Sequence, residues 1–249
     1  MKAAVLNGRE SLVIQEVETP NCGVGEVLIR VKSCGICKTD VKCYMKGQYD
    51  LQLPRILGHE ITGVIEAVGE GVEDFKKGDR VQVFPGIPCG ECEFCKKGMD
   101  NLCDDIKIMG FNYDGGFAEY VLVPCQGVEN GIFNPIPEDI TFEEASMAEP
   151  LGCSVNMQEK LEVSTGDSVV IFGAGRLGIL NGKLAKSRGA AKVILVETNE
   201  NRLSMARAYE FDYLLNPTRQ EVLQEIMKIT GGRGADVVFP SASWLKKVV

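Results

Sequence analysis

Four closely spaced cysteines constrain the folding of this chain more than any other feature. They follow the pattern Cys-x2-Cys-x2-Cys-x7-Cys at Cys89, Cys92, Cys95 and Cys103. Four thiolates in so short a segment suit a tetrahedral zinc ion, and a site closed by four protein ligands is structural. An iron–sulfur cluster is the alternative metal group for the same thiolates. We therefore expect a metal-stabilised lobe that performs no chemistry.

A second group of candidate metal ligands surrounds the only histidine of the chain. His59 stands in the sequence Gly-His-Glu with Glu60, and Cys37 precedes them in the segment CGICKTD, residues 34–40. One histidine, one cysteine and one or two carboxylates can hold zinc with one position open, as catalytic sites do. A metal ion there lowers the pKa of an alcohol, which can then give hydride to a nicotinamide ring.

A glycine-rich motif, GAGRLG at residues 173–178, lies between a predicted strand at Ser168–Phe172 and a predicted helix at Leu177–Arg188. The first glycine permits a tight turn, the second lets the backbone approach a pyrophosphate, and the third allows close helix packing. The start of the helix offers amide donors to the phosphates. The expected cofactor-binding residues of this motif are Gly173, Gly175, Arg176, Leu177 and Gly178.

An acidic residue stands where a dinucleotide-binding unit requires one. Glu197 ends the next predicted strand, Lys192–Val196, about 20 residues after the glycine motif. Its carboxylate can bind the adenosine ribose hydroxyls and would repel a 2′-phosphate, so NAD is favoured over NADP. Arg202 is expected to lie against the adenine.

The pattern of predicted strands and helices changes near residue 155. Before it, short β-type runs separated by glycine turns predict an antiparallel barrel or sandwich. These runs are Glu26–Val31, Gly63–Val68, Arg80–Phe84 and Ala118–Val123. After it, strands alternate with helices and predict a doubly wound parallel sheet. This part adds helices near Glu200–Tyr209 and Arg219–Thr230 and strands at Tyr213–Leu215 and Asp236–Phe239.

A capping signal marks the link between the two parts. Thr141 is followed by glutamate at the third helical position, which predicts the start of the linking helix.

Composition excludes several classes of protein. The net charge of -8 and the pI of about 4.9 oppose broad binding of nucleic acid through its phosphates. No basic stretch precedes an apolar run long enough for a signal peptide or a membrane helix. We therefore expect a soluble cytoplasmic protein with no membrane partner, in which clustered cysteines bind metal rather than form disulfides.

Together these motifs resemble the zinc-dependent medium-chain dehydrogenase family, from residue 1 to about residue 239. The pattern GHE-x2-G-x5-G-x2-V, which begins at Gly58, is similar to the zinc signature of that family. The segment CGIC-x2-D resembles the part that supplies its first catalytic zinc ligand, and the four-cysteine run resembles its structural zinc lobe. The sequence AEPL at Ala148–Leu151 is similar to the polyol and threonine dehydrogenase branch.

The resemblance implies an α/β plus β fold. An N-terminal GroES-like β-barrel catalytic domain with a zinc lobe is expected over 1–155, followed by an incomplete Rossmann sheet over 156–249. It also implies one catalytic zinc, one structural zinc and NAD, which act on a small alcohol or polyol. The full-length family is expected to form homo-oligomers.

The resemblance further implies roles for individual side chains. Cys37 and His59 would be zinc ligands. Glu60 would be the third ligand or an adjacent carboxylate that exchanges with the third ligand. Glu149 would be a ligand or would hold the zinc-bound water. Asp40 would orient the imidazole of His59, and the catalytic Thr39 would accept the alcohol proton.

Two positions depart from the family pattern. Cys43, followed by Tyr44, stands where the polyol branch often has a substrate-contacting tyrosine, and Arg176 replaces the usual proline of the glycine motif. The substrate therefore stays open between sorbitol-like polyols, threonine and simple secondary alcohols.

The dinucleotide domain is shorter than a complete one. About four strands follow Ser168, whereas a full doubly wound domain has six. The ending from Pro240 onward, which holds the only tryptophan, Trp244, also departs from the family. We therefore expect a truncated or frame-shifted product or a fragment, with weak or absent dehydrogenase activity alone. The alternative function is a non-catalytic, zinc-stabilised remnant with a binding or regulatory role.

Overall fold

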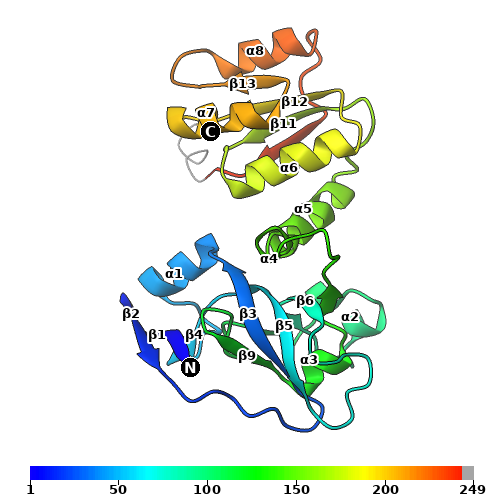
Figure 1. Ribbon diagram of the computed structural model, residues 1–249. Coiled ribbons are helices and arrows are strands. Elements are labelled where there is room, and N and C mark those ends of the chain that lie inside the picture. The colour runs from blue at the N-terminus through cyan, green and yellow to red at the C-terminus, as the bar shows by residue number, and fades with distance from the viewer. Residues whose placement is uncertain (243–249) are drawn as a thin grey trace. The chain divides into compact units, whose positions relative to one another are not determined.

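The computed structural model describes residues 1–242, and the chain forms two compact units, Met1–Glu149 and Pro150–Val249. The units meet inside helix α5 (Ala148–Lys160), so the expected boundary at residue 155 falls within that helix (Figure 1). The sequence expectations for the ending concern Trp244 and its neighbours, which lie outside the described residues. Within residues 1–242, no helix is both long and apolar enough to cross a membrane.

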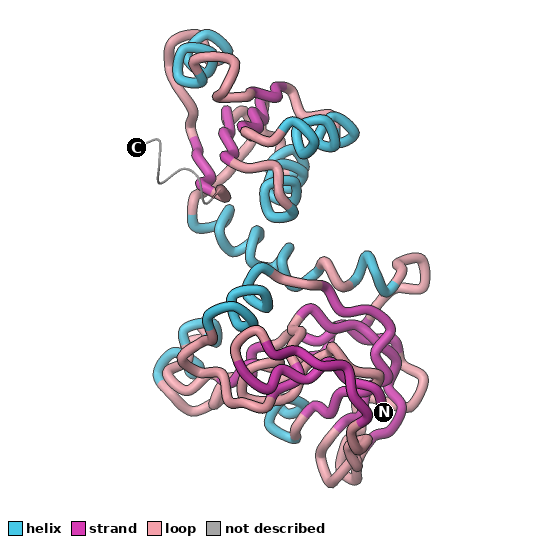
Figure 2. Tube along the Cα trace, turned by 90° about the vertical axis from the view of Figure 1, so that its left-hand side faces the viewer, coloured by secondary structure: helices cyan, strands magenta, loops and turns pink. Residues whose placement is uncertain are grey.

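The strands of the first unit form antiparallel sheets, as the short β-type runs predict. The strands are β1 (Lys2–Gly8), β2 (Ser11–Glu16), β3 (Val27–Gly35), β4 (Arg55–Ile56), β5 (Glu60–Val68), β6 (Arg80–Val83), β7 (Gly86–Ile87), β8 (Lys107–Ile108), β9 (Tyr120–Val123) and β10 (Phe133–Pro135). The central sheet has the order β10-β6-β5-β3-β9, and two smaller sheets have the orders β2-β1-β4 and β7-β8. Figure 2 shows the strands in magenta. The structure thus extends the expected strands β3 and β5 towards the candidate metal ligands.

The core of the first unit follows the two-residue period of its strands. Ile61 and Ile65 on β5, and Val81 and Val83 on β6, are buried together with Val27 of β3 and its neighbours. Alternate side chains of a strand face the same side, so one face of the central sheet packs in the core. This packing fixes the register in which β5 presents its first residues.

Most helices of the first unit are short. They are α1 (Lys38–Lys46), α2 (Glu93–Lys96), α3 (Cys125–Glu129) and α4 (Phe142–Ala145), with a 3-10 turn at Asp100–Leu102. Thr141 caps α4 as expected, because its hydroxyl accepts a hydrogen bond from the Glu144 amide at 3.2 Å. The capped helix nevertheless ends at Ala145, and the longer linking helix α5 begins separately.

The second unit is a four-stranded parallel sheet with helices on both faces, as predicted. Its strands are β11 (Ser168–Phe172), β12 (Lys192–Val196), β13 (Tyr213–Leu215) and β14 (Val237–Pro240), in the order β13-β12-β11-β14. Its helices are α6 (Arg176–Ser187), α7 (Glu200–Ala206) and α8 (Val222–Ile229). One face of the sheet packs against α6 and α7, and the other packs against α8.

We expect Phe239→Ala to destabilise the second unit by about 3–5 kcal/mol, because truncating a large buried side chain leaves a cavity. Phe239 of β14 has no exposed surface. Hydrogen exchange of the β11 amides should report this loss. Val238→Ala on the same strand is the matched control, because Val238 is 47% exposed and should cost less than about 1 kcal/mol. Equal protection in the two variants would show that β14 is not part of this core.

Candidate metal and dinucleotide sites

The four clustered cysteines converge as a tetrahedral metal site requires. The ligand atoms of Cys89, Cys92, Cys95 and Cys103 all lie within 4.8 Å of one another. The Cys95 sulfur lies 3.9 Å from that of Cys89 and 3.5 Å from that of Cys92. Zinc–sulfur bonds of about 2.3 Å in tetrahedral geometry place sulfurs about 3.8 Å apart. The spacing therefore fits a zinc ion.

The backbone of this lobe also favours thiolates. The amide of Cys89 donates to the Cys103 sulfur at 3.2 Å, and the amide of Cys92 donates to the Cys89 sulfur at 3.3 Å. Backbone hydrogen bonds lower the pKa of Cys92 to about 6. Burial and the side-chain contact with Cys92 raise the pKa of Cys95 to about 12. Neighbouring thiols oppose each other's ionisation, so four thiolates need a cation among them.

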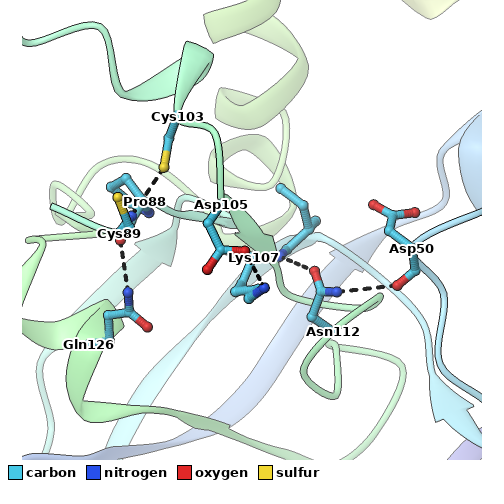
Figure 3. A network of polar contacts seen from close by, with 9 residues as sticks. Asp50, Pro88, Cys89, Cys103, Asp105, Lys107, Asn112 and Gln126 are labelled. Atoms are coloured by element: carbon cyan, nitrogen blue, oxygen red, sulfur yellow. Dashed lines mark hydrogen bonds and ion pairs between the residues drawn. The ribbon is translucent and has the colours of Figure 1, made fainter. Parts of the chain in front are cut away.

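Side-chain amides join this region to other loops of the first unit, as Figure 3 shows. Gln126 of α3 donates to the Pro88 carbonyl at 3.1 Å, next to Cys89. Asn112 accepts from the Ile108 amide at 2.8 Å and donates to the Asp50 carbonyl at 3.2 Å. The chain next to Cys89 is thus joined to α3 by a hydrogen bond that involves no cysteine.

The second candidate group joins Cys37, His59 and Glu60. Cys37 is the N-cap of α1, and Glu60 is the first residue of β5. Their ligand atoms lie within 4.8 Å of one another. Gly35 stands opposite Glu60 in the β3–β5 pair, and a Cβ there would lie 1.9 Å from a Glu60 carboxylate oxygen. A glycine at this position is therefore needed for the site to form.

Asp40 connects two of these candidate ligands. One of its carboxylate oxygens accepts from the Cys37 amide at 2.8 Å, and the other lies 3.4 Å from Nδ1 of His59. That oxygen and Nδ1 are buried and form no hydrogen bond within residues 1–242. A small rotation of the ring would complete the bond, so these atoms fit an imidazole that a metal ion orients.

The same contacts shift the protonation of both ligands. Burial raises the pKa of Cys37, but contacts with His59 and Thr39 outweigh it and lower that pKa overall. Burial lowers the pKa of His59, but contacts with Asp40 and Cys37 outweigh it and raise that pKa to about 10. Without a metal, the site therefore favours a thiolate next to an imidazolium.

The two remaining candidates lie on helices. Thr39 is in the first turn of α1, where its hydroxyl oxygen lies 3.5 Å from the Cys37 sulfur. Glu149 is in the first turn of α5 and is not part of the group within 4.8 Å. The structure thus brings Thr39 to the ligands and leaves Glu149 as a more distant carboxylate.

The glycine motif has the conformation that its three glycines predict. Gly173 has a φ of 109°, and a Cβ on Gly178 would lie 1.9 Å from the Gly173 carbonyl oxygen. A Cβ on Gly175 would meet nothing within 4 Å. Gly175 is the N-cap of α6 and has no side chain that could cap that end. Arg176 and Leu177 are the first residues of α6, and the start of a helix favours an anion.

Glu197 supports this motif from the next strand. Its carboxylate is 2% exposed, accepts from the Ala174 amide at 2.8 Å and from the Asn199 amide at 2.9 Å, and lies 3.9 Å from Arg202. Burial raises its pKa, but these backbone hydrogen bonds outweigh it and lower the pKa overall. Glu197 is therefore charged, and it holds the glycine turn in addition to the expected ribose contact.

Sequence reasoning did not identify two neighbours of these sites. Phe111 packs its ring edge-on against His59, with the centroids 5.7 Å apart, and no local pattern links two positions so far apart in the chain. Gly58 has a φ of 96°, and a Cβ there would lie 2.7 Å from Phe117. Gly58 is the first residue of the Gly-His-Glu pattern, so the sequence contains this glycine but does not by itself show that it contacts Phe117.

Zinc binding at pH 8 should release the proton that His59 holds, because a coordinating imidazole must be neutral. An ordinary histidine, with a pKa of 6.5, would already be neutral there, whereas His59, at about 10, is protonated. The four-cysteine site is first loaded with zinc, because its thiols release protons of their own. Calorimetry in two buffers of different ionisation enthalpy then counts the His59 proton between about pH 6.5 and pH 10.

Asp40→Asn should reduce the release, since it removes the contact that raises the His59 pKa. The exposed Asp74→Asn is the matched control. Equal proton release from the two variants and the parent chain would contradict this assignment.

Gly178→Ala and Gly175→Ala should affect different properties, the first stability and the second dinucleotide binding. The first forces a methyl against the Gly173 carbonyl and should cost about 1–3 kcal/mol of stability. The second should leave stability almost unchanged and weaken dinucleotide binding about tenfold, since its methyl occupies space beside the helix start. Thermal unfolding and NAD titration measure the two effects. A Gly175→Ala chain that binds NAD normally would place the pyrophosphate elsewhere.

Comparison with known proteins identifies the family of the chain. The alcohol dehydrogenase GroES-like domain family matches residues 23–130, and the zinc-binding dehydrogenase family matches residues 177–244. Sorbitol dehydrogenase of Bacillus subtilis is 36% identical over 246 residues, which are 97% of this chain and 68% of that protein. L-threonine 3-dehydrogenase of Pyrococcus furiosus is 41% identical over 225 residues, which are 89% of this chain and 63% of that protein.

A solved structure shows the same fold. An alcohol dehydrogenase from Escherichia coli CFT073, complexed with NADH, superposes with a TM-score of 0.87 at 32% identity, over 99% of this chain and 72% of that one. This chain spans 63–68% of the length of the two curated relatives. The chain belongs to the zinc-binding dehydrogenases, the oxidoreductase family whose N-terminal part is an alcohol dehydrogenase GroES-like domain.

Proposed function

We propose that this chain uses one catalytic zinc, one structural zinc and NAD to oxidise a secondary alcohol or polyol. The observation that carries the proposal is the convergence of Cys37, His59 and Glu60 within 4.8 Å, from two segments of the first unit. Three protein ligands leave a tetrahedral ion one further position, which distinguishes this group from the closed four-cysteine site.

Each side chain of the site has a separate task. Cys37, His59 and Glu60 would hold the catalytic zinc, whose Lewis acidity would lower the pKa of an alcohol. Thr39, whose hydroxyl lies beside the Cys37 sulfur, accepts the alcohol proton and passes it towards solvent. Asp40 keeps His59 oriented, and Glu149 serves as a further ligand or holds the metal's water.

The second unit binds NAD, which accepts the hydride. The amides at the start of α6 bind the pyrophosphate, and the open space at Gly175 lets the backbone approach it. The Glu197 carboxylate binds the adenosine ribose and repels a 2′-phosphate, which favours NAD over NADP. Arg202, 61% exposed along its side chain, lies against the adenine.

The relatives support a small polyhydroxylated or amino-alcohol substrate. Cys43, which is 1% exposed, stands where the polyol branch often has tyrosine, so sorbitol, threonine and simple secondary alcohols are all substrates to test. A cytoplasmic location belongs to the same proposal, because clustered cysteines bind metal in a reducing compartment. We further propose a homo-oligomer without a nucleic-acid or membrane partner.

Metal analysis coupled with NAD binding and alcohol oxidation tests this function on the 249-residue chain. We expect two zinc ions for each chain, tighter binding of NAD than of NADP, and at most weak NAD reduction by one of the three alcohol classes, because the sheet of the second unit has four strands among residues 1–242. Cys37→Ser should remove one zinc and the oxidation, and Cys95→Ser should remove the other zinc.

Cys153→Ser is the control, because Cys153 is exposed and outside both groups. Two zinc ions without NAD binding would contradict the proposal and support a non-catalytic, zinc-stabilised protein.

A further inference from the structure

The segment that leads from β10 to α5 is fastened to the central sheet of the first unit by two side chains. This segment contains residues 137–140 and α4, and α4 ends four residues before Glu149. Arg80 on β6 and Thr62 on β5 make the contacts. Neither residue belongs to the two metal groups, so these contacts need a separate explanation.

Arg80 binds the loop that precedes α4. Its guanidinium donates to the carbonyls of Pro137 at 3.0 Å and Glu138 at 3.1 Å, and it also donates to the Ile140 carbonyl. The same guanidinium lies 4.7 Å from the ring centroid of Phe142. The Arg80 guanidinium thus contacts three residues of the loop and the first residue of α4.

Thr62 binds the first turn of α4 from the neighbouring strand. It has no exposed surface, and its hydroxyl oxygen lies 2.9 Å from the Phe142 carbonyl and 3.1 Å from the Ser33 carbonyl. The single hydroxyl proton is shared between these two acceptors. Thr62 therefore ties α4 to β3 and β5, two residues beyond Glu60 on β5.

The short stretch from Thr141 to Met147 is held together by hydrogen bonds between its own residues. The Thr141 amide donates to the Glu144 carboxylate at 2.9 Å, and the Met147 amide donates to the Glu144 carbonyl at 3.0 Å. The Ser146 hydroxyl donates to the Glu143 carbonyl at 2.7 Å. A shift of α4 would therefore carry the start of α5, and Glu149 with it.

We propose that Thr62 and Arg80 are positioning residues for Glu149. They hold α4 against the strands that carry and flank Glu60, so that the barrel presents both carboxylates in a fixed arrangement. The inference rests on the proposed function, because it takes Glu149 to serve the catalytic zinc. Residues that orient metal-binding groups commonly contribute 10–100-fold to metal affinity.

Thr62→Val tests this role, since it removes the hydroxyl and keeps the shape of the side chain. We expect the catalytic zinc to be released to a chelator about tenfold faster, while the four-cysteine zinc is released at its original rate. Cobalt(II) in the catalytic site should show an altered visible spectrum. Thr62→Ser should restore both values, and Thr165→Val, which removes a hydroxyl bonded to Arg188 in the second unit, should change neither.

Combination with Glu149→Gln tests the route of the effect. If Thr62 acts through Glu149, the double variant should release zinc no faster than Glu149→Gln alone. Independent, multiplying effects would overturn the inference, as would unchanged zinc release in Thr62→Val. A parent chain that binds no metal at Cys37 and His59 would overturn the proposed function as well, which separates the two failures.

Arg80→Gln approaches the same segment from the other strand, should Thr62→Val fail to fold. It removes most of the loop contacts and should produce the same faster release and the same spectral change. Arg30→Gln is its control, because Arg30 lies on the central sheet but pairs only with the Glu66 carboxylate at 3.2 Å in the described chain. Normal release of the catalytic zinc from Arg80→Gln would overturn the inference.

Discussion

The antiparallel pairing of β3 with β5 is the constraint on which the candidate metal site depends. Gly35 stands opposite Glu60 in this pair, so Cys37 leaves one strand at the point where His59 and Glu60 enter the other. A slip of one residue would turn these side chains to opposite faces. The register is fixed by buried residues such as Ile61 and Ile65, which contribute no chemistry themselves. The hydrophobic core of the barrel therefore determines where the ligands meet.

A single carboxylate, that of Asp40, lies next to two of the candidate metal ligands. Asp40 accepts from the Cys37 amide at the start of α1 and faces Nδ1 of His59. One side chain thus caps a helix, faces the His59 ring and raises the pKa of that ring. Because three properties depend on the same residue, helix formation and ligand arrangement are coupled in this part of the barrel.

The sequence predicts the parts of the molecule that depend on local pattern. Strands β11, β12 and β13 have the expected bounds, because their apolar runs lie between clear turn signals. Cys95 and its three companions were predicted from spacing alone, since neighbouring ligands need little of the fold to converge. Helix α1 was not predicted, because its cap is Cys37, a poor capping residue whose amide depends on Asp40. The break between α4, which ends at Ala145, and α5, which begins at Ala148, was likewise not predicted, since no glycine or proline stands between them in the sequence.

The hydrogen bond between Glu197 and the Ala174 amide has a consequence for cofactor entry. A glycine-rich turn is the most flexible kind of backbone, and ordering it when a ligand arrives would cost conformational entropy. Here a buried carboxylate from the neighbouring strand already holds the turn. That entropy is lost during folding instead, so a dinucleotide meets a pre-organised surface. Glu197, which we propose to bind the ribose, therefore also limits the conformational entropy that the turn loses when a dinucleotide binds.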